Sequence, residues 1–250
     1  METLNVASRR EWLSARKALL IKEKQLTKEL DALNRARREL PLVKIDKNYV
    51  FEGPKGSLSL DDLFEGRRQL IIYHFMFHRD KGVGCVGCSF MADNMSGLAH
   101  LNARGVTLAL VSRAPLAEIA PFQKRMGWSM PWYSSFGSDF NYDFHATTDE
   151  KIAPVEYNYR SKAELEAAGE NYHVEGEQPG ASVFVRRGED IYHSYSTYGR
   201  GLDMLLGVNH WSDLTPDGRG EGWDGMPNLK IKTRFHDEYE KTPTACGCGA

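Results

Sequence analysis

A long apolar run that leads directly to two closely spaced cysteines is the feature that most constrains this sequence. Residues 69–77 read QLIIYHFMF, which is typical of a β-strand covered on both faces. A glycine-rich loop, residues 81–84 (KGVG), follows, and then come Cys85, Cys88 and a predicted helix. Because a strand covered on both faces needs other elements above and below it, this order predicts an α/β domain.

The rest of the central region alternates between predicted helices and strands. We expect helices over residues 90–103 and 116–126, with a second buried strand, VTLALV, over residues 106–111 between them. Residues 181–185 and 190–195 flank the turn sequence RRGE and predict a β-hairpin. This alternation indicates a parallel or mixed sheet with helices on its faces.

The predicted position of the two cysteines determines their chemistry. Cys85 lies at the N-terminus of a helix, where unpaired backbone N–H groups and the helix dipole favour an anion. A thiolate there is stabilised, so the pKa of Cys85 should fall from about 8.5 toward 7 or lower. Cys88 lies one turn further along, within reach of a disulfide with Cys85. Such a pair can attack a substrate disulfide through Cys85 and release the product through Cys88.

Composition and charge argue against several other classes of protein. The 250 residues carry a formal net charge of -2, so no nucleic-acid partner is expected. No stretch of about 18 apolar residues predicts a membrane span, and residues 1–10 lack the apolar run of a secretion signal. We therefore expect a cytoplasmic protein whose four cysteines serve redox work or metal binding rather than structural disulfides.

Residues 8–40 predict one long helix ahead of the α/β domain. Ser8 and Glu11 have the spacing of a capping box, and Pro41 ends the helix. One apolar stripe recurs every seven residues: Trp12, Leu19, Leu26, Leu33 and Leu40. The second heptad seam is mostly charged, so we expect the helix to cover its own domain or to form a homodimer rather than a full coiled coil. Its lysines and arginines are also compatible with an alternative, in which the helix binds nucleic acid or a protein partner. Such charges, however, usually form a solvated helix face.

The sequence thus divides into three parts. Residues 1–41 form an N-terminal helical arm, residues 42–211 the α/β domain, and residues 212–250 a C-terminal extension that is rich in glycine and proline. Cys246 and Cys248 lie near the end of this extension. Three interpretations stay open for them: auxiliary thiols that exchange with the first pair, two further thiolate ligands of a metal, or incidental residues of a tail.

Four sequence phrases indicate a relationship to known proteins: RRQLIIYHFMF, GCVGCSF, SSFGSDFNYDF and HSYSTYGRGLDMLLG. The order of strand, loop, C-x-x-C and helix resembles the thioredoxin-like fold, and residues 53–128 look like its peroxiredoxin-type branch. The whole chain resembles the bacterial thioredoxin-like family catalogued as domain of unknown function 899 (DUF899). This resemblance implies a thioredoxin-like mixed sheet flanked by helices, with a long N-terminal helix and an irregular C-terminal tail.

The sequence departs from the peroxiredoxin pattern at two places. Those enzymes carry a threonine three residues before the reactive cysteine, where Gly82 stands here, and an arginine just before a later strand, where residues 178–181 read QPGA. We therefore expect only slow reduction of hydrogen peroxide. Thioredoxins carry a cis-proline before that same strand, facing the disulfide, and Pro179 is the candidate for this role.

A metal site is the main alternative to disulfide chemistry. His74 and His78 flank the end of the buried strand, and positions four apart in a strand point to the same face, so both could face the cysteine loop. Copper assembly proteins of the Sco type, which are also thioredoxin-like, bind copper through a cysteine pair and a histidine. Because thiolates and imidazole suit copper or zinc, the candidate ligands are Cys85, Cys88, His74 and His78.

Thiol–disulfide oxidoreductase chemistry is the leading hypothesis. Cys85 would be the nucleophile and Cys88 the resolving thiol, with no cofactor required. The partner would be a redox protein or a small thiol or disulfide. The second hypothesis is a copper or zinc protein or metalloenzyme, and the third is a non-catalytic interaction module that uses the N-terminal helix.

Overall fold

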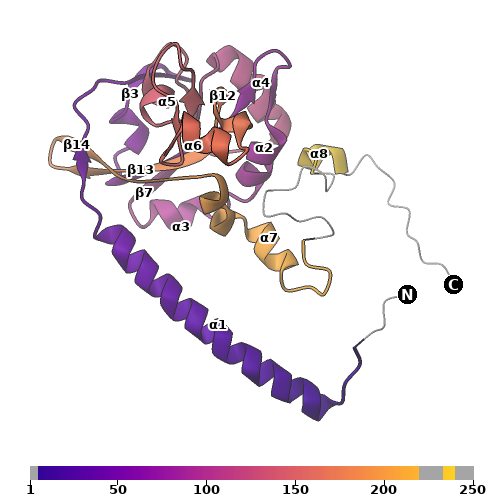
Figure 1. Ribbon diagram of the computed structural model, residues 1–250. Coiled ribbons are helices and arrows are strands. Elements are labelled where there is room, and N and C mark those ends of the chain that lie inside the picture. The colour runs from indigo at the N-terminus through magenta and orange to yellow at the C-terminus, as the bar shows by residue number, and fades with distance from the viewer. Residues whose placement is uncertain (1–4, 220–232, 240–250) are drawn as a thin grey trace. The chain divides into compact units, whose positions relative to one another are not determined.

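The structure is a computed structural model, and it describes residues 5–219 and 233–239 of the chain (Figure 1). The chain divides into two compact units, Met1–Leu42 and Val43–Ala250. The first unit extends one residue beyond the boundary that we expected for the helical arm. Most of the expected C-terminal extension, including Cys246 and Cys248, lies outside the described residues.

The first unit consists mainly of helix α1 (Arg9–Arg38), which Figure 1 shows as one uninterrupted helix. Ser8 and Glu11 form the predicted capping box, in which the Ser8 N–H donates to the Glu11 carboxylate over 2.9 Å. None of the α1 residues is buried, and Trp12 keeps 48% of its surface exposed. The predicted helix is therefore confirmed. That its apolar stripe packs against its own domain or a second copy of the chain stays a prediction.

The second unit is built on an eight-stranded mixed sheet. In order across the sheet, the strands are β1 (Val43–Lys44), β14 (Asp190–Tyr198), β13 (Gly180–Arg187), β4 (Gln69–His74), β7 (Val106–Ser112), β8 (Trp132–Ser134), β2 (Val50–Gly53) and β3 (Gly56–Ser59). Strands β4, β7 and β8 run parallel to one another, and β13 pairs antiparallel with β4. Central strand β4 therefore has a ladder on each side, which agrees with its apolar sequence.

The helices and 3-10 turns of the second unit connect these strands and cover both faces of the sheet. Among the described residues they are α2 (Val86–Asp93), α3 (Leu98–Asn102), α4 (Leu116–Met126), α5 (Phe140–Asp143), α6 (Lys162–Ala167), α7 (Gly207–Ser212) and α8 (His236–Tyr239), with the 3-10 turns η1 (Asp62–Phe64), η2 (Asn171–His173) and η3 (Gly199–Leu205). The order β4–α2–β7 followed by the β13–β14 hairpin and η3 is thioredoxin-like, as the resemblance implies.

Alternation along the strands separates two apolar cores, one on each face of the sheet. Tyr73 and Leu110 pack with Met91 of α2 and Phe122 of α4, on what we call the cysteine face because Cys88 belongs to the same core. Their neighbours in sequence pack with Phe64, Phe140 and Phe184 on the opposite face; these neighbours are Ile72, Ala109 and Val111.

A long connection between β8 and β13 contains two small two-stranded sheets. Strand β9 (Thr147–Thr148) pairs with β12 (Gly176–Glu177), and β10 (Glu156–Tyr157) pairs with β11 (Arg160–Ser161). Helix α6 follows β11. Val155, Tyr157 and Leu165 of this connection form a small core with Tyr198 of β14, so the connection packs against the main sheet.

Two predicted elements are shorter than expected. The strand predicted over residues 69–77 ends at His74, and Phe77–His78 instead forms β5, which pairs with β6 (Val83–Gly84). The helix predicted over residues 90–103 is divided into α2 and α3, because the Asn94 side chain donates to the Phe90 carbonyl over 2.7 Å and Gly97 adopts a φ of 72°. The other strands and helices predicted above are confirmed within a few residues.

No helix of the described part of the chain combines the length and the hydrophobicity that a membrane span requires.

Candidate functional site

Cys85 lies at the junction between the β5–β6 hairpin and helix α2. It is the N-cap residue of α2, with an extended backbone (φ -62°, ψ 135°), and its N–H donates to the Met76 carbonyl over 2.9 Å. The preceding residue, Gly84, packs closely against two aromatic rings: a Cβ at this position would lie 2.7 Å from the rings of Phe75 and Phe122. The local sequence therefore places the thiol at the start of the helix, where we expected it.

The environment of Cys85 favours its thiolate. A hydrogen bond with the Cys88 thiol is the largest cause, and backbone N–H groups of Cys88 and Gly87 add to it. The nearby imidazole of His78 lowers the pKa further, while burial raises it. Together these effects lower the pKa of Cys85 to about 6.

Cys88 has the opposite environment. Its side chain is buried in the core on the cysteine face, and burial is the largest cause that raises its pKa well above the ordinary value, followed by the proximity of Cys85. The Met76 N–H lies 3.5 Å from Cys88 Sγ, and the phenol of Tyr73 also makes a hydrogen bond with this sulfur. At neutral pH the site thus combines a thiolate at Cys85 with a thiol at Cys88, and neither is in a disulfide.

A cavity of about 310 Å³ opens beside the two sulfurs. Strand β4 and helix α2 form one side through Tyr73, Met76 and Phe90, and the segment around η3 forms another through Leu202. Residues far away in the sequence close the remaining side; these are Tyr172, His173, Glu177, Gln178 and Pro179. The cysteine pair therefore opens into a partly open cavity that three separate segments build.

Comparison with known proteins identifies the family of this chain. The family model described as "Bacterial protein of unknown function (DUF899)" matches residues 1–239. The chain belongs to this family. No curated protein matches the DUF899 chain.

The solved structures that match the fold of this chain include several thioredoxin-like proteins. A cysteine-to-serine mutant of PrxQ from Xylella fastidiosa is 13% identical, with 66% of the DUF899 chain and 89% of the other chain covered and a TM-score of 0.40. A thiol:disulfide interchange protein from Bacteroides sp. is 14% identical, with 72% and 95% covered and a TM-score of 0.38. A secreted Mycobacterium tuberculosis disulfide oxidoreductase, homologous to E. coli DsbE, is 12% identical, with 64% and 92% covered and a TM-score of 0.36.

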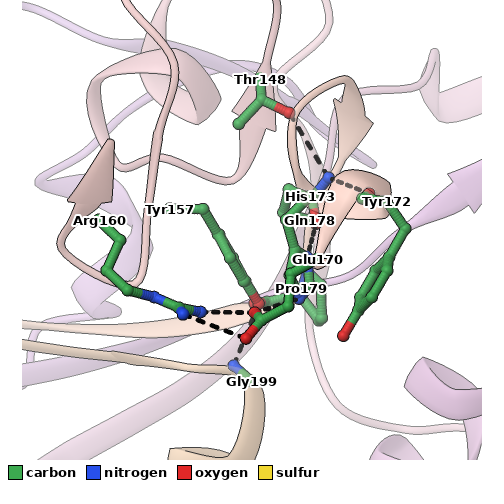
Figure 2. A network of polar contacts seen from close by, with 9 residues as sticks. All are labelled: Thr148, Tyr157, Arg160, Glu170, Tyr172, His173, Gln178, Pro179 and Gly199. Atoms are coloured by element: carbon green, nitrogen blue, oxygen red, sulfur yellow. Dashed lines mark hydrogen bonds and ion pairs between the residues drawn. The ribbon is translucent and has the colours of Figure 1, made fainter. Parts of the chain in front are cut away.

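Pro179 lines the cavity of the DUF899 protein, but its peptide bond is not cis. No cis peptide bond occurs among the described residues, so the cis geometry that the resemblance implied for Pro179 is wrong. The Gln178 N–H donates to the Ala146 carbonyl over 2.9 Å, which fixes the direction of the chain as it enters β13. On the other side, the Tyr157 hydroxyl donates to the Pro179 carbonyl over 2.8 Å (Figure 2).

His74 lies on the wrong face of the sheet to join the cysteines. It is buried against the Phe140 and Phe144 rings on the opposite face, where its Nε2 lies 2.8 Å from the Ser182 hydroxyl. Burial lowers the pKa of His74 to about 3. The expectation that His74 and His78 share a face is wrong because the strand ends at His74, so the alternation does not continue to residue 78.

The candidate metal ligands are therefore not brought together as a set of four. His78 lies close enough to Cys85 to lower its pKa, but its side chain is exposed in β5. Across residues 5–219 and 233–239, no three histidine, cysteine, aspartate or glutamate side chains are grouped so that they could hold a metal ion. Any contribution from Cys246 and Cys248 falls outside those residues.

Sequence analysis missed two titratable residues of the site. Tyr73 is buried beside Cys88, and burial raises its pKa well above the ordinary value. Glu177 lines the cavity, accepts a hydrogen bond from the Thr147 hydroxyl over 3.0 Å, and has its pKa raised by burial. A tyrosine directly after the aliphatic run Leu70–Ile72 was a usable signal for the first. The second had no comparable signal, because it reaches the site from a segment about 90 residues away.

Proposed function

We propose that this DUF899 protein is a thiol–disulfide oxidoreductase in which Cys85 is the nucleophile and Cys88 the resolving thiol. The observation that carries the proposal is the pairing of the two sulfurs across the first turn of α2. The Cys85 thiol opens into the cavity with a lowered pKa, and the buried Cys88 thiol hydrogen-bonds to it with a raised pKa. This division of roles is what stepwise thiol–disulfide exchange needs.

The first step is attack of the Cys85 thiolate on one sulfur of a substrate disulfide. The substrate S–S bond breaks, a mixed disulfide with Cys85 forms, and the second substrate sulfur leaves as a thiolate that takes up a proton. Because the pKa of Cys85 is about 6, most of this residue is ready to react at neutral pH. No cofactor takes part in this step.

The second step uses Cys88. It loses its proton and attacks Cys85 Sγ, which releases the remaining substrate thiol and leaves a Cys85–Cys88 disulfide. Two electrons pass from the cysteine pair to the substrate, and a dithiol protein or small thiol must return them. The hydrogen bond from Tyr73 favours the Cys88 thiolate during this step, so we assign Tyr73 a positioning role.

Reduction of a small disulfide by single-cysteine variants tests this proposal. We expect Cys88→Ser to accumulate a mixed disulfide at Cys85, and Cys85→Ser to react at least tenfold more slowly with the substrate. Mass spectrometry of the reacted peptides identifies the cysteine that carries the mixed disulfide. Equal reaction rates for the two variants would exclude the assigned roles. A role in a reducing compartment such as the cytoplasm is part of the same proposal, because the pair must be returned to its dithiol form.

Hydrogen peroxide is expected to be a poor substrate. Gly82 takes the place of the peroxiredoxin threonine, and it offers no side chain to hold the peroxide. A second-order rate close to that of a free thiol of similar pKa is the expected result. A rate larger by orders of magnitude would point to peroxidase chemistry instead.

A further inference from the structure

The walls of the cavity beside Cys85 are mostly apolar. Met76 follows strand β4, Phe90 and Met91 come from α2, and Leu202 and Leu206 come from η3 and the residue after it. Met91, Leu202 and Leu206 are buried in the core on the cysteine face. These side chains offer methyl, thioether and ring surface to whatever enters, and burial of apolar ligand surface against them is favourable.

Polar residues around the cavity form hydrogen bonds with one another. Figure 2 shows this network: His173 Nδ1 lies 2.6 Å from Gln178 Oε1, and Gln178 Nε2 donates to the Tyr172 carbonyl over 3.2 Å. The Tyr157 hydroxyl, which donates to the Pro179 carbonyl, also accepts the Gly199 N–H over 3.1 Å.

The charged side chains that line the cavity are Glu177, Arg200 and Asp203, and Glu177 forms an ion pair with Arg113 over 3.4 Å. Arg160 forms an ion pair with Glu170 at the edge of the network (Figure 2). Asp203, which lines the cavity, accepts a hydrogen bond from Arg219 over 2.7 Å and another from Asn209 over 3.2 Å. Recruiting Glu177, Asp203 or Arg160 to a charged substrate would first require breaking an existing bond, which costs free energy.

The volume of the cavity also limits its occupant. About 310 Å³ is at the small end of the range for pockets that hold small molecules. A compact organic group fits such a space, whereas a folded polypeptide would have to present its disulfide from outside. Tyr172 at the boundary is 55% exposed and stands between the cavity and solvent.

We infer that the cavity selects a small, uncharged, apolar organic disulfide and directs one of its sulfurs to Cys85. The inference rests on the proposed function. One alkyl or aryl group occupies the space between Phe90 and Leu202 while the Cys85 thiolate attacks the adjacent sulfur. The products are two molecules of the apolar thiol and the Cys85–Cys88 disulfide, which an external dithiol such as dithiothreitol reduces again.

A series of dialkyl disulfides tests the inference. Dimethyl, diethyl and dipropyl disulfide differ in apolar length but not in charge, and bis(2-hydroxyethyl) disulfide, cystamine and dithiodiglycolate supply polar, cationic and anionic counterparts. Each rate is divided by the rate of the same disulfide with a small free thiol of known pKa, which removes differences in intrinsic reactivity. We expect the corrected rate to rise about fourfold for each methylene buried, and the three polar disulfides to fall below diethyl disulfide.

Phe90→Ser is the matched cavity variant. It should flatten the dependence on alkyl length, whereas Phe136→Ser, the same substitution at an exposed ring outside the cavity, should leave it unchanged. Dividing each rate by the alkylation rate of Cys85 with iodoacetamide corrects for any change in thiolate reactivity. Circular dichroism melting curves show whether each variant is folded.

The outcomes separate this inference from the proposed function. Reduction that depends on Cys85 but not on alkyl length, or that is as fast with cystamine or dithiodiglycolate, would overturn the apolar substrate and leave the oxidoreductase standing. Cys85-dependent reduction of a protein disulfide, such as that of insulin, that is faster than reduction of the dialkyl disulfides would also overturn the apolar substrate and leave the oxidoreductase standing. If no disulfide reacts in a Cys85-dependent way, both proposals fail.

Discussion

Removal of the Cys88 thiol should change the acidity of Cys85 by a measurable amount. The hydrogen bond with Cys88 is the largest cause of the lowered Cys85 pKa of about 6. A hydrogen bond to a charged group contributes about 1.5–3 kcal/mol, and one pKa unit corresponds to about 1.36 kcal/mol. Cys88→Ala should therefore raise the pKa of Cys85 by about one to two units.

This shift has a direct effect on reactivity. A pKa of about 6 leaves roughly 90% of Cys85 as thiolate at pH 7. A pKa of about 7 to 8 leaves roughly 50% to 10%, so the alkylation rate at pH 7 should fall about two- to tenfold. Cys88→Ser keeps a hydroxyl donor at the same place, and we expect a smaller shift for it than for Cys88→Ala.

The assay is the rate of alkylation by iodoacetamide between pH 4 and 10. Mass spectrometry of the peptide that contains Cys85 separates its reaction from that of any other thiol. The midpoint of each pH profile gives the pKa. The reasoning is refuted if Cys88→Ala and the unmodified protein share one midpoint, or if the unmodified protein titrates near the ordinary value of about 8.5.

Three other predictions follow from the same geometry. Because the pKa of Cys85 is lower in the folded state, the thiolate's contribution to stability is complete above about pH 9 and is lost as the pH falls through about 6. Between pH 5 and pH 7 the free energy of unfolding, measured with urea, should therefore rise by about 1.3 kcal/mol less in Cys85→Ser than in the unmodified protein. Tyr73→Phe should slow the Cys88 step about tenfold, so that the mixed disulfide persists in quenched single-turnover samples; an unchanged release rate would remove Tyr73 from the mechanism. Gly84→Ala should lower the free energy of unfolding by about 1–3 kcal/mol, because the new methyl group would lie 2.7 Å from two aromatic rings, and an unchanged melting temperature would contradict this reading of the packing.

The cysteine position could be predicted from sequence because it depends on local order alone. A buried strand, a glycine-rich loop and a helix follow one another within about 25 residues, and the chain has few other ways to connect them. The prediction of Cys85 at the start of α2 needed no knowledge of distant segments. The capping box of α1 was predictable for the same reason, since Ser8 and Glu11 are three residues apart.

The error at His74 has a different physical origin. Alternation assigns faces only while a strand continues, and the length of the apolar run gave no sign that β4 ends at residue 74. The next two aromatic side chains, Phe75 and Phe77, both pack on the cysteine face, which a continuous strand also allows. Only the antiparallel pairing of β5 with β6 reveals the change in direction.

The cavity could not be predicted because its walls meet only in the folded chain. Phe90 belongs to the cysteine helix, but Tyr172, Pro179 and Leu202 come from segments 80 to 120 residues later. Nothing in their sequence marks them as neighbours of Cys85. Pairing of β13 with β4 places them there, and that pairing depends on the whole sheet.

The order in which the ribosome delivers these segments has a consequence for biosynthesis. Cys85 and Cys88 leave the ribosome about 90 residues before Pro179, which at about 5–20 residues per second corresponds to roughly 5–20 s. During this interval β4 has no β13 beside it, and the cavity wall that includes Pro179 does not yet exist. The nascent cysteines are therefore open to any oxidant in their surroundings, and pulse labelling of stalled nascent chains with a charged alkylating reagent should modify them far more readily than in the finished protein.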